Sequence, residues 1–320
     1  MKPIIKYRGG KSKELAHIEQ CIPRFEGRYI EPFFGGGAVF FHLEPRLAII
    51  NDINGALMNF YRSVRDDFPS LQQELCEMEL TYTTNRKVYE ELKAKNPNIR
   101  VEDRNEEVYY HLRAQFNGTE PKQYSDSALY YYINKTAYSG MIRYNSSGEF
   151  NVPFGRYAHL NTALVSEAHS KLLQRAEIYS TDFSEIFRMC TRDDFMFLDP
   201  PYDCVFSDYG NVEYRDGFDE QEHIRLAHLF RELPCKALMI IGKTPLIESL
   251  YKDYILGEYT KNYSVNIRNR FKANATHLIV ANYRKQEDNP YQDGGRLLNV
   301  YTIPEVAQPF LFDPHKTEEQ

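Results

Sequence analysis

The feature that most constrains the fold is a strand, a glycine-rich turn and a helix in direct succession near the start of the chain. The segment RYIEPFFGGGAVFFHL predicts a short strand over Arg28–Ile30, a tight turn over Gly35–Gly37 and a helix from Ala38. A second strand, RLAIIND, ends in Asn51 and Asp52, and the amphipathic helix INGALMNFYRSV follows it. Strands and helices that alternate in this way predict an α/β fold with a doubly wound parallel sheet.

The same alternation returns in the second half of the chain. AEIYSTDF is a predicted strand that ends in Asp182, and FMFLDPPY and CKALMIIGK are two more, separated by a helix over residues 219–233. We expect THLIVANY to close the sheet as its last strand. Near the start, the periodicity of Leu15, Ile18 and Ile22 predicts a helix over residues 11–22.

A segment of different character separates these two halves. Residues from about 66 to 133 are charged, tyrosine-rich and helical in pattern, and residues 134–157 hold Ser-Gly, Asn-Ser-Ser-Gly and Pro-Phe-Gly turns that predict an irregular loop and hairpin. We therefore expect a discontinuous α/β domain over 1–56 and 165–285, an inserted domain over 57–164 and a tail over 286–320.

Composition narrows the class of protein. With 320 residues and 42% hydrophobic residues, the chain has enough apolar material for a sizeable core. The five cysteines lie far apart and form no CxxC pair, which argues against a disulfide framework or a zinc site, so no metal is expected. No signal peptide and no run long enough to cross a bilayer is recognisable, and a cytoplasmic protein without membrane contact is expected.

Charge is unevenly distributed. The net charge is −6, yet residues 1–13 and 261–285 carry lysines and arginines without any Asp or Glu, while the tail after Lys285 is mostly acidic. The basic segments are candidates for contact with phosphates, although uneven surface charge alone explains them equally well.

Chemically useful residues follow three predicted strands. The glycine turn allows a ligand to approach bare backbone, Asp52 is suited to accept hydrogen bonds from ribose hydroxyls, and Asp182 with Phe183 to grip an adenine ring. The dinucleotide fingerprint GxGxxG is not completed after Gly35, and GGKSK lacks the first glycine of a P-loop because Ile5 stands there. S-adenosylmethionine, a nucleoside without phosphate, fits these strand ends better than NAD or ATP.

The motif DPPY, from Asp199 to Tyr202, follows the strand FMFL. The two prolines stiffen an extended loop, which points the Asp199 carboxylate and the Pro200 carbonyl in one direction while Tyr202 offers a ring face. Two acceptors and a stacking surface suit the exocyclic amine of a planar base, which has to leave a duplex to reach them. A purely structural turn is the alternative.

Taken together, KYRGGK, EPFFGGG, NDIN, DPPY and YSGMIRYNSSGEFNVPFGRY closely resemble the Dam-type (D12 class, alpha group) DNA adenine-N6 methyltransferases, from about Lys6 to Tyr283. The resemblance implies a Rossmann-like, S-adenosylmethionine-dependent methyltransferase fold with a helical target-recognition insert that carries a β-hairpin. It also implies double-stranded DNA as the partner, adenine N6 within GATC as the target, and a bacterial or phage origin. A monomer is expected.

The resemblance assigns roles to three sets of residues. The target adenine would be held by Asp199, Pro200, Pro201 and Tyr202. The cofactor would be bound by Tyr7, Lys11, Phe33, Gly35, Asp52, Asp182, Phe183 and Asp199. DNA would be contacted by Lys6, Tyr138, Ser139, Met141, Arg143, Pro153 and Arg156. Within this last set, Tyr138 would fill the gap left by the extruded base, and Arg143 would read a guanine through O6 and N7.

The sequence departs from the best-known members at several positions. Tyr7-Arg8 stands in place of Trp-Ala, and Ser139 and Met141 stand where some members carry Asn and Leu. Arg8 could contact DNA phosphate or the cofactor carboxylate, or lie in solvent. The alternatives to a GATC methyltransferase are a different target sequence, a catalytically inactive DNA-binding regulator, an N4-cytosine enzyme and an RNA or protein methyltransferase.

Overall fold

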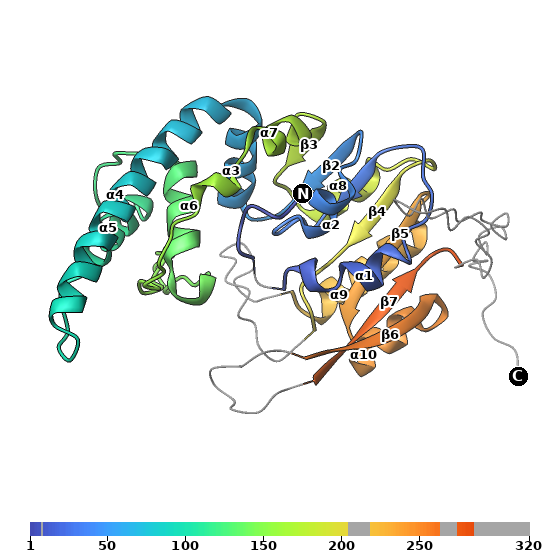
Figure 1. The fold of residues 1–320 in the computed structure, drawn as a ribbon. Helices are drawn as coiled ribbons and strands as arrows, with labels where there is room; N and C mark the ends of the chain where they lie inside the picture. Colours follow the sequence, from blue (N-terminus) through green and yellow to red (C-terminus); the bar gives the residue numbers. More distant parts are fainter. Residues whose placement is uncertain (8, 204–217, 263–273, 285–320) are drawn as a thin grey trace, which may run out of the picture.

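The computed structural model describes residues 1–7, 9–203, 218–262 and 274–284. Figure 1 shows a sheet flanked by helices, from which a helical arm extends to one side. The strands are β1 (Tyr29–Glu31), β2 (Ala48–Asn51), β3 (Ala176–Tyr179), β4 (Phe195–Leu198), β5 (Lys236–Gly242), β6 (Ile255–Asn262) and β7 (Asn274–Ala281). The α-helices are α1 (Leu15–Glu19), α2 (Ala38–Leu43), α3 (Gly55–Asp66), α4 (Phe68–Lys95), α5 (Arg104–Phe116), α6 (Asp126–Thr136), α7 (Glu167–Leu173), α8 (Phe183–Arg188), α9 (Glu220–Glu232) and α10 (Pro245–Tyr251). Short 3-10 helices are η1 (Lys11–Lys13), η2 (Tyr138–Gly140), η3 (Thr162–Leu164) and η4 (Lys252–Tyr254).

The strands of the described residues form one sheet in the order β3-β2-β1-β4-β5-β7-β6. Strands β1 to β5 are parallel, and β7 runs antiparallel to both β5 and β6. The chain winds outward from β1 toward β3 and, in the other direction, from β4 toward β5. The order therefore reverses between β1 and β4, and a crevice opens at the carboxyl ends of these two strands.

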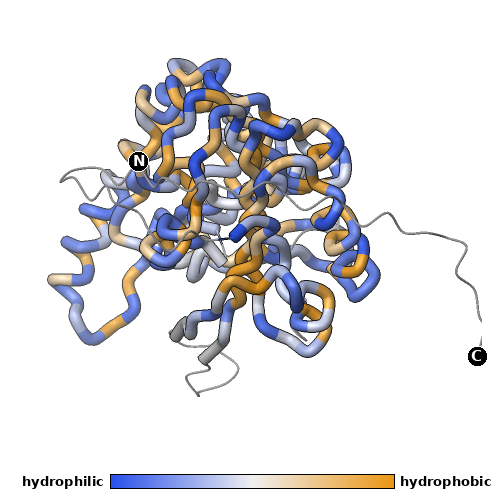
Figure 2. The backbone as a smooth tube through the Cα atoms, turned by 90° about the vertical axis from the view of Figure 1, so that its right-hand side faces the viewer, coloured by the Kyte–Doolittle hydropathy of each residue, from blue (hydrophilic) through white to orange (hydrophobic). Residues whose placement is uncertain are grey.

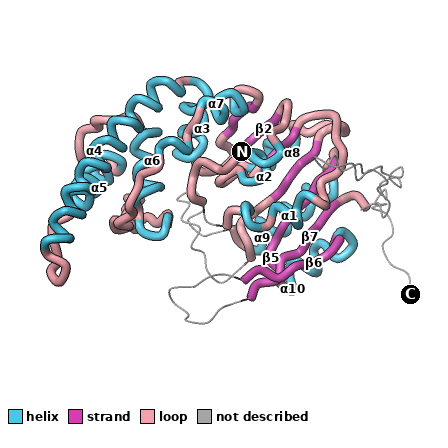
Figure 3. The backbone as a smooth tube through the Cα atoms, viewed as in Figure 1, coloured by secondary structure: helices cyan, strands magenta, loops and turns pink. Residues whose placement is uncertain are grey.

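Each strand of the sheet presents alternate side chains to two apolar layers. In β4, Phe195 and Phe197 belong to one core cluster, which α2, α3 and α7 cover, while Met196 and Leu198 belong to the other, which α8, α9 and α10 cover. Figure 3 shows the strands between these helices, and Figure 2 shows hydrophobic residues along the central strands. Burial on both faces explains why these strands read as short apolar runs.

The strand predicted for THLIVANY is present as β7, the last strand along the described chain. Strand β7 lies inside the sheet, and β6 forms the edge beside it, with Tyr259 paired to His277. Because an edge strand is only partly buried, β6 has a weak apolar pattern, and this strand was not predicted. The helix predicted over residues 11–22 is also interrupted: it consists of η1 and the short α1.

The insert is helical, as predicted, and its core continues into the sheet. On α3, Tyr61 meets Phe34 edge-on with ring centroids 4.9 Å apart, and Phe60 lies 5.8 Å from Tyr131 of α6. Ser125 caps α6 by accepting a hydrogen bond from the backbone N–H of Ala128. The expected boundary at 56/57 falls within α3, which packs on both parts, and the division into domains stays a prediction.

Beyond α6, residues 137–154 form the predicted irregular hairpin. Isolated antiparallel bridges join Ala137 to Phe154 and Tyr144 to Phe150. At the tip, the Asn145 side chain accepts hydrogen bonds from the backbone N–H groups of Ser147 and Glu149, which closes the turn.

The first seven residues run between the sheet and the insert. Asn134 of α6 grips the backbone of Lys6: its Oδ1 accepts from the Lys6 N–H at 3.0 Å, and its Nδ2 donates to the Lys6 carbonyl at 2.8 Å. The buried Lys135 ammonium donates to the carbonyl of Ile4. The backbone of this segment is therefore attached to the insert by the side chains of Asn134 and Lys135, while its last residue, Tyr7, packs on the glycine turn of the sheet.

Candidate active site and DNA-facing loop

A cleft with about 810 Å³ of empty space, part of it open to solvent, lies at the carboxyl ends of β1 and β4. The glycine turn, the loop after β2 and the DPPY loop meet there. The lining includes the predicted site residues Tyr7, Lys11, Phe33, Gly35, Asp52, Phe183, Asp199, Pro200, Pro201 and Tyr202. Most of the residues assigned to the cofactor and the target base therefore share one cavity.

The glycine turn is shaped by the ring of Tyr7. Gly35 has a φ of +47°, and a Cβ at this position would lie 2.7 Å from Cδ1 of Tyr7. Both the left-handed backbone and the ring contact require glycine. The backbone of the turn is thus exposed to the cleft on one side and closed by an aromatic ring on the other.

Asp52 is held rigidly at the wall of the cleft. One carboxylate oxygen accepts from the N–H of Gly35 at 2.8 Å, and the other accepts from the N–H of Asn54 at 3.0 Å. The preceding Asn51 donates to the carbonyls of Pro32 and Thr181 and so ties together the loops after three neighbouring strands. These bonds fix the position of the Asp52 carboxylate at the wall of the cleft.

Phe183 lines the cleft, but Asp182 does not. Phe183 and Phe33 form an aromatic pair with ring centroids 5.2 Å apart. Asp182 caps α8 through the Ser184 N–H and makes a bidentate pair with Arg225, with both N–O distances at 2.8 Å. The Arg225 guanidinium holds the pKa of Asp182 well below its usual range. A role for Asp182 toward a cofactor stays a prediction.

The DPPY loop brings an ion pair into the cleft. The Lys11 ammonium lies 2.6 Å from Oδ2 of Asp199 and also donates to the Gly9 carbonyl at 2.8 Å. It lies 5.1 Å from the centre of the Tyr202 ring. The Tyr202 ring in turn rests on β5, where a Cβ at Gly242 would be 3.2 Å from its Cδ2. Lys11, Asp199 and Tyr202 thus form one compact group at the cleft.

Glu31, a buried acid that was not predicted as a site residue, also lines the cleft. Its Oε2 accepts a hydrogen bond from the Tyr29 hydroxyl at 2.7 Å. Burial raises the pKa of Glu31 well above its usual range. The segment EPFF repeats the acid-proline-aromatic pattern of DPPY after a strand, and this similarity was the available signal.

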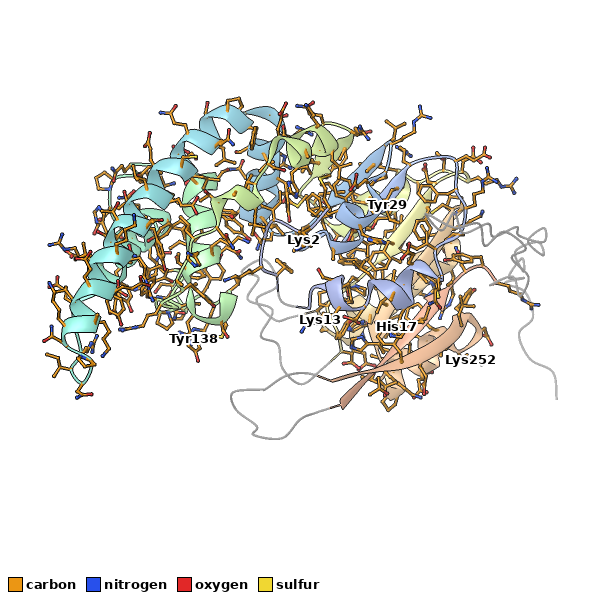
Figure 4. All side chains as sticks on the ribbon, in the orientation of Figure 1. Lys2, Lys13, His17, Tyr29, Tyr138 and Lys252 are labelled. Carbon is orange, nitrogen blue, oxygen red and sulfur yellow. The ribbon has the colours of Figure 1, made fainter. Side chains whose placement is uncertain are left out.

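On the insert, the hairpin carries most of the residues predicted to contact DNA. The Tyr138 N–H donates to the carbonyl of Pro153 at 2.8 Å, and Tyr138, which lies just after α6 on the lower side of the insert (Figure 4), is 46% exposed. Ser139 has a φ of +57° in the adjoining turn. The exposed Arg143 donates from Nε to Oδ1 of Asn151 at 2.7 Å, so its guanidinium is oriented before any ligand binds.

The other predicted DNA contacts surround this hairpin. Lys6 lies beside Gly140, where a Cβ would be 3.1 Å from its Cδ, and its ammonium lies 3.8 Å from the centre of the Tyr157 ring. Burial lowers the pKa of Lys6. Met141 is half-buried against the core. Arg156 is occupied elsewhere, because it pairs with Glu106 of α5 at 2.7 Å.

Some expectations lie outside the described residues: the role of Arg8, the acidic tail, and residues 263–273 and 285 of the basic segment. Among the residues that the structure describes, no cluster of three potential metal ligands occurs. None of the described helices is both long and apolar enough to span a bilayer.

The sheet order, the antiparallel β7 and the cleft at the switch point define the chain as a protein with the S-adenosylmethionine-dependent methyltransferase fold. More closely, the chain belongs to the D12 class N6 adenine-specific DNA methyltransferases, whose sequence model matches residues 7–267. It is an adenine-specific DNA methyltransferase, and DNA is its substrate. The family and the fold that the sequence predicted are confirmed.

Its relatives come from viruses, archaea and bacteria. The chain is 35% identical to the type II methyltransferase M.CviBI of Paramecium bursaria Chlorella virus NC1A over 291 residues, 88% of this chain and 100% of the relative. It is 30% identical to the type II methyltransferase M.MjaIII of Methanocaldococcus jannaschii, over 91% of this chain and 97% of the relative. It is 31% identical to the DNA adenine methylase of Haemophilus influenzae, over 63% of this chain and 64% of the relative.

Proposed function

We propose that the chain transfers a methyl group from S-adenosylmethionine to N6 of an adenine that has turned out of duplex DNA, within the sequence GATC. The observation that carries this proposal is that Asp199 and Tyr202 of the DPPY loop share one cleft with the glycine turn and Asp52. A methyl donor and a target amine can therefore lie side by side.

The cleft fits a nucleoside sulfonium. Phe33 and Phe183 offer ring faces to an adenine, and Asp52 offers carboxylate oxygens to ribose hydroxyls. Among the described residues that line the cleft, the one lysine or arginine is Lys11, and it is paired with Asp199. This lining provides no cationic grip for a phosphate, which favours S-adenosylmethionine over a nucleotide.

Bound S-adenosylmethionine would supply an electrophilic methyl group. The chain's own residues position the amine. Asp199 and the Pro200 carbonyl accept hydrogen bonds from its two N–H groups, and the Tyr202 ring stacks on the base. When both N–H groups are hydrogen-bonded in this way, the nitrogen lone pair points away from the acceptors and toward the side of the cleft where the methyl donor would lie. Lys11 orients the Asp199 carboxylate before the base arrives.

The hairpin on the insert supports recognition of duplex DNA. Arg143 presents a guanidinium that suits the O6 and N7 acceptors of guanine, and Asn151 limits its rotation. The exposed ring of Tyr138 suits the space that an extruded base leaves behind. Pro153 fixes the position of Tyr138 through its carbonyl.

The test is transfer of a labelled methyl group to duplexes that carry GATC, a scrambled site or no adenine. Label in the GATC duplex alone supports the full proposal. Label at another adenine-containing site retains the chemistry and replaces the target sequence. Binding without label in any adenine-containing DNA would overturn the proposal and favour an inactive DNA-binding protein. A duplex with 2-aminopurine at the target position reports base extrusion as a rise in fluorescence.

A further inference from the structure

Behind the DPPY loop, aromatic rings form a row across three neighbouring strands. Gly242 of β5, His277 of β7 and Tyr259 of β6 are paired across the sheet. The Tyr202 ring lies over Gly242 and meets the His277 ring edge-on, with centroids 5.1 Å apart and an interplanar angle of 79°. His277 meets Tyr259 at 5.3 Å, and His17 of α1 stacks on Tyr259 at 4.9 Å (Figure 4 labels His17). Tyr202 is therefore supported from behind by His277.

The orientation of His277 is set by a buried acid. Oε2 of Glu14 lies 2.9 Å from Nδ1 of His277 and also accepts from the Tyr259 hydroxyl. The side chain of His277 is 1% exposed and that of Glu14 is 4% exposed. Because a carboxylate only accepts, Nδ1 of His277 is the donor, and the ring cannot rotate without breaking this bond.

Glu14 is also close along the chain to Lys11, which lines the cleft. It directly follows η1, which carries Lys11, and Lys11 bonds to Asp199. The Glu14 backbone thus closes the turn that carries Lys11, the partner of Asp199, while the Glu14 carboxylate holds the histidine behind the Tyr202 ring. A stacking ring has to be held within about 0.5 Å of its productive place, and such precision comes from packing and hydrogen bonds behind it.

We propose that Glu14 and His277 are positioning residues for methyl transfer, which act through the Tyr202 ring by holding it where the target base stacks. This proposal rests on the proposed function, in which Tyr202 contacts the base. Neither residue touches the cofactor cleft, since neither lines it. Their loss should slow the transfer step and leave cofactor affinity in place.

The experiment measures single-turnover methyl transfer with excess enzyme, labelled S-adenosylmethionine and DNA amplified in vitro, which carries no methyl groups. His277→Asn keeps an N–H in the place of Nδ1 but removes the ring edge, and we expect it to slow transfer about tenfold. Its affinity for S-adenosylmethionine, measured by calorimetry, should change by less than about twofold. Glu14→Ala should slow transfer similarly, and Glu14→Gln, which keeps an acceptor for Nδ1, should restore most of the rate.

The decisive comparison is made in a Tyr202→Ala background. If His277 acts through Tyr202, His277→Asn will cause no further slowing there, and the two effects will not add. Equal slowing in both backgrounds, or none in either, would overturn the inference. If Tyr202→Ala alone leaves the rate unchanged, the proposed function fails instead. His169→Asn, which removes a buried histidine on α7, serves as the matched control and should leave the rate unchanged.

A milder variant covers the case in which His277→Asn or Glu14→Ala fails to fold. Tyr259→Phe keeps the ring beside His277 and removes only the hydroxyl that bonds to Glu14. We expect a threefold to tenfold slowing (about 1 kcal/mol for one hydrogen bond) in the natural background and none with Tyr202→Ala. Slowing of the same size in both would contradict the inference.

Discussion

The Nζ atom of Lys11 lies 2.6 Å from Oδ2 of Asp199, and the lysine side chain is only 3% exposed. This pair joins the segment before α1 to the loop after β4, two parts of the chain 188 residues apart. A buried ammonium without its partner is unfavourable, so the pair links the stability of the cleft to the acid that would hold the target amine.

Replacing Asp199 separates catalysis from cofactor binding. We expect Asp199→Ala to abolish methyl transfer, because the N6 amine loses its charged acceptor, while calorimetry shows S-adenosylmethionine binding largely retained. Asp199→Asn, which keeps an acceptor oxygen for Lys11, should be the more stable of the two variants. Transfer by Asp199→Ala at more than about a tenth of the normal rate would contradict the assigned role.

Gly35→Ala should close the cofactor cleft. The new Cβ would meet the Tyr7 ring at 2.7 Å on a backbone with φ +47°. We expect binding of S-adenosylmethionine to weaken by at least about tenfold, since either the turn or the ring has to move. Gly118→Ala is the control: it introduces the same kind of backbone strain at φ +74° with nothing within 4 Å, far from the cleft. Similar weakening in both variants would show that strain alone is responsible.

Arg143→Ala should relax recognition at one G·C pair. Loss of a bidentate contact to guanine costs about 1–3 kcal/mol, which corresponds to roughly a 5- to 150-fold lower rate on the preferred site at limiting DNA. Rates on duplexes substituted at each position in turn will locate that pair. Arg86→Ala on α4, which removes an arginine paired with Glu90, should leave the preference unchanged. Unaltered preference in the Arg143 variant would remove this arginine from base reading.

Lys135 gives the protein a pH-dependent stability. Burial lowers the pKa of Lys135 from 10.5 to about 8 in the folded chain. Between these values the unfolded chain binds more protons than the folded one, so the contribution of Lys135 to stability rises with pH through this window. Relative to Lys135→Met, the wild-type free energy of unfolding should increase by about 1–2 kcal/mol from about pH 7.5 to 9.5. Urea titrations of both proteins at each pH will test this, and a constant difference would contradict it.

The sequence predicted the strand ends well, because short apolar runs followed by Gly, Asp or Asp-Pro-Pro leave few other structures for the chain. The glycine turn, Asp52 and the DPPY loop do meet in one cleft. Strand β6 was missed since its half-exposed residues follow no clear alternation. The irregular hairpin, in contrast, was predicted from its turn residues alone.

Pairings between distant parts of the chain could not be predicted. Asp182 looks like a cofactor acid in the sequence, yet its partner Arg225 lies 43 residues further along. Glu14 and His277 are 263 residues apart, and neither belongs to a recognisable motif. Such contacts depend on how the sheet assembles, which local patterns do not encode.

The grip of Asn134 on the backbone of Lys6 has a practical consequence for engineering. An insert taken from a relative would have to supply the same two hydrogen bonds to the backbone of Lys6, because the next residue, Tyr7, packs against the glycine turn. A chimera would therefore be designed with residues 1–7 and the insert from the same parent.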